Sequence, residues 1–391
     1  MNTEPTGTDR ARLRTLSCIG GALAAATVGL PFRARAAARE IHVAMMLPLQ
    51  GGQARQAEMI RQGVDGALEQ ANRAGGIRGQ HVKLLAIDNG YQAEKTVEAI
   101  GSLAARESVV AVTSLFGGPI IGAAIPAATR AGVPIVGVLH GNDAFRRPGT
   151  EIVTHVRATF DAEIRAIAAL FPTIGRSRFA VLHATDNSGT AFRAQFESVL
   201  KAQGLPLVAA VPYERDVTDY TEQARSIERS GADVVVVGGV TAPGIAAIRA
   251  KVATKLWAQM VCLSTVDERS VWEQLGADAV GTAFSSVVPN PYATLLPLAR
   301  EYQAAMKARS YDRLSLSSFE GYINAQVLLE GLRRAPALTR PALQGTLRAM
   351  QGVSLGGVSF SAPAEGKIAS GIDVADILVM THNGVSSFSV Q

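Results

Sequence analysis

The sequence predicts an α/β fold made of two doubly wound domains in succession. Apolar, β-branched runs alternate with amphipathic helical patterns from residue 41 to residue 288, and this cycle restarts near residue 162. The run DVVVVG at 233–238 is continuously apolar, as expected of a strand that is buried on both faces. Strands that alternate with helices in this way form parallel sheets covered by helices.

The first series opens with a short apolar strand and a long helix. In that helix, Ile60, Val64 and Leu68 recur at helical spacing, and Gly75-Gly76 ends it because glycine accepts a left-handed cap. The predicted helices of this series cover 54–74, 93–106 and 119–131, and the predicted strands cover 41–47, 81–88, 109–113, 133–138 and 151–156.

The second series repeats the pattern and is followed by a mostly helical segment. Its predicted helices cover 162–171, 190–203, 220–230 and 242–253, and its strands cover 178–183, 207–211, 233–238, 260–263 and 279–288. Three helices within 289–310, 317–335 and 339–350 come next, and short strands are expected at 358–361, 374–380 and 386–390. Asn383-Gly384 favours a tight turn, so the last two strands are expected to form a hairpin.

The N-terminus predicts a cleaved signal peptide at 1–38. Arg10, Arg12 and Arg14 precede an apolar run at 16–30, and two A-x-A cleavage sites follow within 34–38. The alternative is a membrane anchor, but the run is shorter than the roughly 20 apolar residues that span a bilayer. We therefore expect a periplasmic protein.

Charge and motif content exclude several classes of function. The first 38 residues hold five arginines and two acids, so their removal changes the formal charge from +5 to +2 and leaves no basic excess for nucleic acid. The loop LPLQGGQARQ lacks the G-x-G-x-x-G of dinucleotide enzymes, and no esterase elbow, P-loop or metal-ligand spacing is present. We expect no catalytic residue, metal or cofactor, and Cys262 fits a buried strand better than a nucleophile.

Ordered motifs along the mature chain resemble a known family. They are MLPLQGG, GVDGALEQANRAGGIRGQHVKLLAIDN, EKTVEAIGSL, VVAVTSLFGGP, IPAATRAGVPIVG, FDAEIRAIA, DNSGTAFRAQFESVLKAQG and SSFEGYINAQVLLEGLRRA. The chain resembles type I periplasmic substrate-binding proteins of ABC importers, in the branched-chain amino-acid-binding (leucine-binding-like) group.

This resemblance implies the periplasmic-binding-protein-like I fold, with two Rossmann-like lobes joined by three crossings. Lobe one would comprise 41–157 plus 285–352, and lobe two 158–284 plus 353–391. A small-molecule ligand would bind between the lobes, which close by hinge motion. The resemblance also implies an inner-membrane ABC permease as partner, and we expect a monomer. A periplasmic sensor or receptor of the same fold is the alternative.

Ligands of open α/β sheets bind at the carboxyl ends of strands, which selects the candidate site. Arg55 could pair with an anion or be a solvated residue of the first helix, and His140 could donate to a carboxylate or simply pack. The candidate residues are Gln50, Arg55, Gln56, Phe116, Gly117, Gly118, His140, Gly141, Asn142, Ser188, Thr241, Thr265 and Asp267.

The kind of ligand is predicted from two features: the start of the helix after Gly117-Gly118, and position 265, where the residue differs from that of the family's amino-acid binders. Backbone N–H groups at Gly117-Gly118 form a natural carboxylate site, although a plain tight turn is the alternative. The resemblance places Thr265 where amino-acid binders carry an acid for the ligand's ammonium group. We therefore expect a small polar ligand, either a carboxylate-bearing organic acid, which needs no acidic partner, or an amino-acid-like molecule whose ammonium group Asp267 would accept.

Overall fold

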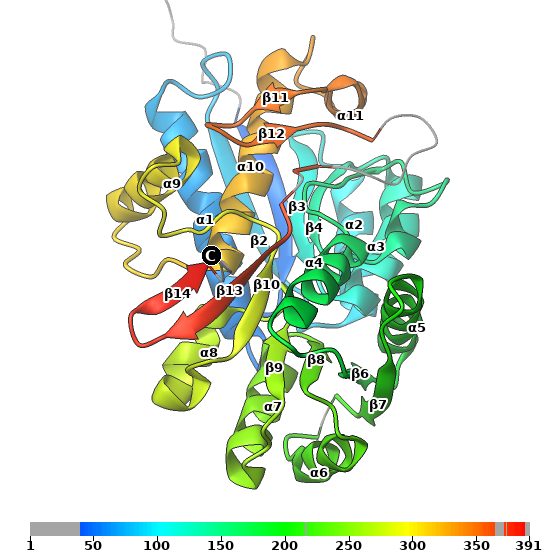
Figure 1. Ribbon diagram of the computed structural model, residues 1–391. Helices are drawn as coiled ribbons and strands as arrows, with labels where there is room; N and C mark the ends of the chain where they lie inside the picture. Colours follow the sequence, from blue (N-terminus) through cyan, green and yellow to red (C-terminus); the bar gives the residue numbers. More distant parts are fainter. Residues whose placement is uncertain (1–39, 216, 364–370, 373, 388–391) are drawn as a thin grey trace, which may run out of the picture. The chain divides into compact units, whose positions relative to one another are not determined.

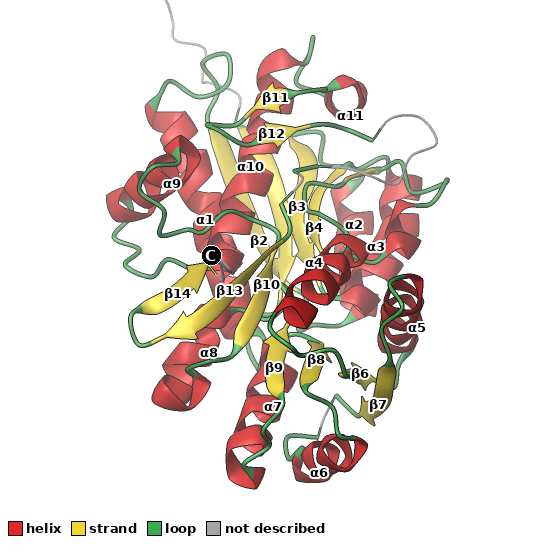
Figure 2. Ribbon diagram, in the orientation of Figure 1, coloured by secondary structure: helices red, strands yellow, loops and turns green. Residues whose placement is uncertain are grey.

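The computed structural model describes residues 40–215, 217–363, 371–372 and 374–387. Within them, two sheets are covered by helices, as Figure 2 shows. This arrangement confirms the predicted α/β class with two doubly wound sheets. The expected signal peptide at 1–38 lies outside the described residues.

The first sheet is parallel and has the strand order β2-β1-β3-β4-β5 (Figure 1). Alternate residues of β1 face opposite layers: Val43 packs with Ile60 and Val64, whereas Ala44 packs with Ile100 and Ile121. One layer contains α1 (Ala54–Arg73) and α10 (Leu316–Arg334), and the other contains α2 (Ala93–Leu103) and α3 (Gly118–Ala131). The strands are β1 (Ile41–Leu47), β2 (Val82–Asp88), β3 (Val109–Phe116), β4 (Ile135–Leu139) and β5 (Val153–Thr154).

The second sheet has the order β14-β13-β10-β9-β8-β6-β7. In it, β13 runs antiparallel to β10, and β14 runs antiparallel to β13. Its strands are β6 (Phe179–Ala184), β7 (Leu207–Tyr213), β8 (Val234–Gly238), β9 (Gln259–Cys262), β10 (Ala283–Ser286), β13 (Asp376–Thr381) and β14 (Gly384–Ser387). Its helices are α4 (Phe160–Thr173), α5 (Asn187–Ala202), α6 (Thr221–Ser230), α7 (Thr241–Thr254) and α8 (Glu268–Leu275). The predicted β-hairpin is confirmed by the pairing of Thr381 with Gly384.

The chain passes between the two sheets three times, as predicted. It leaves the first sheet after β5, returns after β10 to α9 (Pro297–Ala308) and α10, and enters the second sheet again at β13. Before that last passage lie α11 (Arg340–Ala349), β11 (Val353–Ser354) and β12 (Ser359–Phe360). Two short 3₁₀ helices, η1 (Asp143–Arg146) and η2 (Gly276–Ala279), complete the described elements.

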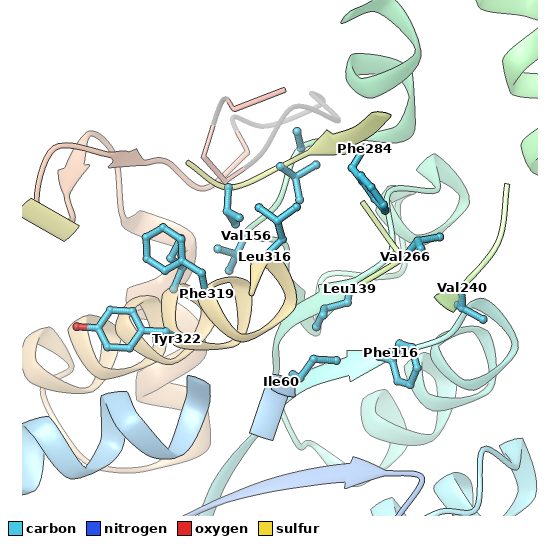
Figure 3. Packing of buried hydrophobic residues seen from close by; sticks show 14 of the residues in the cluster. Ile60, Phe116, Leu139, Val156, Val240, Val266, Phe284, Leu316, Phe319 and Tyr322 are labelled. Carbon is cyan, nitrogen blue, oxygen red and sulfur yellow. The ribbon is translucent and has the colours of Figure 1, made fainter. Parts of the chain in front are cut away.

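One apolar core runs from α1 and α10 to the strand ends of the second sheet. Figure 3 shows Phe319 and Tyr322 of α10 in the same cluster as Phe116 of β3 and Phe284 of β10. Glycine lets α1 and α10 approach closely, since a Cβ at Gly63 would lie 1.7 Å from Ser318 O. The loops that follow the strands of both sheets are therefore anchored to one continuous apolar core.

Some predicted elements were wrong in extent. The strand expected at 151–156 shrinks to Val153–Thr154 because it pairs only with β4 at the sheet edge. The strand expected at 279–288 is β10, and residue 279 belongs to η2. Sequence reasoning missed α8, an eight-residue helix that Asp267 caps by accepting from Ser270 N–H at 2.8 Å. In the described part of the chain, no helix is both long enough and apolar enough to cross a membrane.

Candidate functional site

A pocket lies where the carboxyl ends of strands from both sheets meet. Its empty volume, open mouth included, is about 380 Å³. It is lined by loops that follow β2, β3 and β4 of the first sheet and β6, β7, β8 and β9 of the second. Both sheets reverse strand order here, between β1 and β3 and between β6 and β8, which is where open α/β sheets bind ligands. The lining residues are Tyr91, Gly118, His140, Phe160, Ser188, Gly189, Phe192, Arg215, Gly238, Gly239, Val240, Leu263 and Thr265.

Two helices present uncapped N-termini to this pocket. The N-cap residues are Gly117 of α3 and Val240 of α7, and neither helix start has a side-chain cap. The first backbone N–H groups of a helix lack intrahelical partners and carry partial positive charge, so both ends attract an anion. The N-terminus of α5 differs, because Asp186 already accepts from Gly189 N–H at 2.8 Å.

His140 is a neutral hydrogen-bond donor toward the pocket. Burial, reinforced by the nearby charge of Arg157, lowers its pKa to about 3. The backbone N–H of Asn142 donates to His140 Nδ1 at 3.3 Å, which places the ring proton on Nε2. That Nε2 lies 3.4 Å from Ser188 Oγ at the pocket wall.

Tyr91 contributes a second donor from the loop after β2. Its backbone is left-handed, with φ 58°, and its ring packs against Phe116 with centroids 5.5 Å apart. Burial raises the pKa of the Tyr91 hydroxyl, which therefore stays protonated. The hydroxyl oxygen is buried and has no hydrogen-bond partner among the described residues, so it is available to an occupant of the pocket.

Arg215 is the cation of the pocket. It follows β7, and its Nε donates to Asp186 Oδ2, the same carboxylate that caps α5. This pairing fixes the guanidinium at the pocket wall. No residue of the described pocket lining carries a carboxylate, so Arg215, His140 Nε2–H, the Tyr91 hydroxyl and two helix N-termini all favour an anionic group.

The remaining walls are apolar and close together. Phe160 packs against His140 with ring centroids 4.8 Å apart and against Phe192 with centroids 5.3 Å apart. Leu263 and Val240 complete this side. Glycine at position 118 keeps this wall close to the next, since a Cβ there would lie 2.3 Å from Ser188 Oγ. The pocket lining therefore combines a cluster of polar donors with an apolar wall.

The structure brings four of the thirteen candidate residues into the pocket lining, namely Gly118, His140, Ser188 and Thr265. Four others sit directly beside it. Phe116 packs under Tyr91, Gly117 caps α3, Gly141 O accepts from Phe160 N–H at 2.8 Å, and Asn142 Oδ1 accepts from Ala144 N–H at 2.8 Å. Gln50 is exposed and lies outside the lining.

Gln56, Thr241 and Asp267 form a buried network that joins the two sheets' helices. Thr241 Oγ1 donates to Gln56 Oε1 at 2.6 Å, and Asp267 N–H donates to Thr241 Oγ1 at 2.9 Å. Gln56 Nε2 donates to the carbonyl of Thr265, a lining residue, at 2.9 Å. These contacts position the pocket wall, although the three side chains do not line it.

Arg55 pairs with a protein carboxylate. Its guanidinium donates from Nε to Glu273 Oε2 at 2.9 Å and from Nη2 to Oε1 at 3.0 Å. Arg55 lies on α1 and Glu273 on α8, so this bidentate pair links helices that cover different sheets. Arg55 therefore pairs in bidentate fashion with a carboxylate of the protein itself, and it does not line the pocket.

Sequence reasoning missed Tyr91 and Arg215. Both follow strands, β2 and β7, whose carboxyl ends were not searched for site residues. The strand-end rule that selected His140 would have selected them too. Among the described residues, no group of three or more His, Cys, Asp or Glu side chains is placed to hold a metal ion.

Two doubly wound sheets with an anion-favouring pocket between their strand ends define a solute-binding protein. The chain belongs to the periplasmic binding protein family, whose sequence profile, described as "Periplasmic binding protein", matches residues 40–377. The members and structures it resembles are binding proteins rather than enzymes.

Individual relatives agree with this assignment. The chain is 24% identical over 329 residues to Leu/Ile/Val-binding protein homolog 3 of Brucella melitensis, a match that covers 80% of this chain and 83% of the relative. A substrate-binding periplasmic protein from Ralstonia solanacearum superposes with TM-score 0.82 at 26% identity, covering 89% of this chain and 100% of that one. An extracellular ligand-binding receptor from Verminephrobacter eiseniae superposes with TM-score 0.82 at 27% identity, covering 90% and 100%.

Proposed function

We propose that this protein is the periplasmic solute-binding component of an ABC importer and that it traps a small carboxylate-bearing molecule between its two lobes. Family membership supports a periplasmic location and a small-molecule ligand. An inner-membrane ABC permease is the proposed partner, and residues 1–38 are the proposed export signal. The proposed lobes are 41–157 plus 285–352 and 158–284 plus 353–391.

One observation carries the choice of a carboxylate. The described pocket lining contains Arg215 and the donors of Tyr91 and His140, but no acidic residue. An α-amino acid needs an acceptor for its ammonium group, since a buried unpaired charge is costly. Asp267, the alternative acceptor, is fully buried outside the lining, where it accepts from Ser270 N–H and Ser270 Oγ.

The apolar walls support a compact hydrophobic body on the ligand. Phe160, Phe192 and Leu263 are buried residues of the pocket lining. Apolar pocket walls contribute affinity, while a few placed polar groups fix orientation. Of the thirteen residues predicted from the sequence, we propose that Gly118, His140, Ser188 and Thr265 touch the ligand.

Native mass spectrometry of the protein purified without refolding tests this function. Retained ligand would add a small mass, and fragmentation would identify its functional groups. A carboxylate without an amine supports the proposal. A retained peptide, sugar or amine, or a protein whose melting temperature no small acid changes, would overturn it, because a ligand that binds only the folded state stabilises it.

A further inference from the structure

A second pocket lies away from the strand-end pocket, between α8, the β13–β14 hairpin and the loop that precedes α9. Its empty volume is about 600 Å³, open mouth included. In Figure 1, the β13–β14 hairpin lies just above α8, and α9 lies higher in the view. The two pockets share no lining residue.

The inner part of this pocket contains an unsatisfied carboxyl group. Glu268 lines the pocket, yet its side chain is only 1% exposed. Its Oε1 accepts from Leu316 N–H at 2.9 Å, whereas its Oε2 is buried with no hydrogen-bond partner in the described residues. A buried polar atom without a partner costs free energy, which an occupant that donates a hydrogen bond would recover.

Aromatic and apolar side chains surround that carboxyl. Trp272 of α8 and Tyr292 of the preceding loop are half-buried, and Met380 of β13 is buried. Tyr292 keeps its hydroxyl occupied by donating to Leu314 O at 2.9 Å, so its ring is what it offers to the pocket. A carboxylate beside aromatic rings is a combination that suits an organic cation.

The charges around Glu268 agree with this chemistry. Burial and the adjacent carboxylate of Asp267 raise the pKa of Glu268 well above its usual range, so a cation that pairs with this carboxyl would stabilise its ionised form. Arg269, which also lines the pocket, is engaged with Glu273 at 3.2 Å. The other titratable groups that face the carboxyl are Tyr292, His382 of the hairpin and Tyr302 of α9.

We propose that this pocket is a second binding site, which takes a small organic cation: a primary ammonium group with a short apolar body. The ammonium donates to Glu268 Oε2, and the body packs against Trp272, Tyr292 and Met380. The site touches the lobe-two helix α8 and a loop that leads into lobe one, so its occupant would contact both sides of a crossing.

Trp272 provides a direct reporter for this site. The chain has two tryptophans, and the other, Trp257, is 70% exposed beside Arg176. In a Trp257→Phe background, titration with n-butylammonium is expected to change Trp272 fluorescence to saturation. The neutral analogue n-butanol and the anion butyrate are expected to bind at least tenfold more weakly.

Matched variants separate the site from an unspecific effect. Glu268→Gln keeps the acceptor for Leu316 N–H and is expected to weaken n-butylammonium binding at least tenfold, whereas Tyr292→Phe keeps the ring and stays within twofold. Tyr292→Leu removes the ring and is expected to weaken n-butylammonium binding at least threefold. This variant tests the site if Glu268→Gln does not fold. Arg193→Gln, at a partly exposed position of α5 that lines neither pocket, is expected to leave n-butylammonium binding unchanged. No saturable response to n-butylammonium, an equal response to n-butanol or butyrate, or unchanged affinity in folded Glu268→Gln would overturn the proposal.

Discussion

His140 Nε2 lies 3.4 Å from Ser188 Oγ across the strand-end pocket, and the two residues follow strands of different sheets. His140 comes after β4 and Ser188 begins α5 after β6. Their approach means that the pocket walls are already in contact, so a ligand carboxylate would be enclosed rather than rest on an open surface. The proposed enclosure of the ligand depends on this short distance between His140 and Ser188.

Arg215→Gln should weaken binding of the ligand carboxylate by about 10- to 100-fold. The reason is the loss of a charge-assisted hydrogen bond, worth about 1.5–3 kcal/mol. Isothermal titration calorimetry measures the change. Arg193→Gln is the matched control, because Arg193 on α5 pairs with exposed Glu197 at 3.6 Å outside the pocket. Equal affinities for both variants would contradict the role of Arg215.

Gly118→Ala should lower ligand affinity by about tenfold, since overpacking at a tight contact costs about 1–3 kcal/mol. The new Cβ would lie 2.3 Å from Ser188 Oγ and 3.0 Å from His140 Nε2. The double variant Gly118→Ala, Ser188→Gly should recover part of the affinity, because the closest clash is removed. A binding assay on both variants and the unchanged protein checks this, and an unchanged affinity in Gly118→Ala alone would show that the walls need not meet.

Arg55→Ala should weaken ligand binding by a small factor, roughly two- to fivefold, and Glu273→Gln by at least as much, because Glu273 also pairs with Arg269 and Arg313. The pair is partly exposed, so the interaction is worth at most about 1 kcal/mol. The double variant should be no weaker than Glu273→Gln alone, because Glu273→Gln already removes the pair with Arg55. If Arg55→Ala alone abolished binding while Glu273→Gln did not, Arg55 would contact the ligand directly.

Glu320 should make the stability of the protein depend on pH. It is buried on α10, where Arg157 Nη1 approaches Glu320 Oε1 at 3.5 Å and Arg157 also pairs with Glu163 of α4 at 3.3 Å. Burial, with Arg157 opposing it, raises the pKa of Glu320 to about 7. Since the usual value is 4.5, the folded state binds the proton more tightly, and this stabilisation is lost as pH rises from 4.5 to 7.

Glu320→Gln removes that dependence. Relative to the unchanged protein, the variant should gain on the order of 3 kcal/mol of unfolding free energy between pH 4.5 and pH 7, at about 1.4 kcal/mol for each pH unit. Urea unfolding at several pH values gives the difference. A stability difference that stays constant with pH would show that folding does not raise the pKa of Glu320.

The fold was predictable because its signals are local and repeated. The continuous apolar strand Val234–Gly238 and the periodic helix Ala54–Arg73 both appear close to their predicted bounds. The bounds of the edge strand Val153–Thr154 were not predicted, because they depend on pairing with one neighbouring strand. Helix α8 was not predicted either, because its start depends on a single cap at Asp267.

The site was predictable only as a set of strand-end loops. His140 and Gly118 follow from that rule, but the ion pair of Arg55 with Glu273 joins residues 218 positions apart, which no local pattern reveals. Nor does the sequence show that Asp186 both caps α5 and fixes Arg215. Such contacts between the sheets exist only once the chain is folded.

Recognition of a carboxylate by the strand-end pocket is tested most directly by thermal unfolding with matched sets of ligands. Each set contains one compact body, aliphatic or aromatic, carried as the carboxylate, the primary amide and the α-amino acid. We predict that at least one carboxylate raises the melting temperature, that its amide does not, and that its α-amino acid does so less. An amide or an α-amino acid that stabilises the protein as much as the carboxylate would contradict the account.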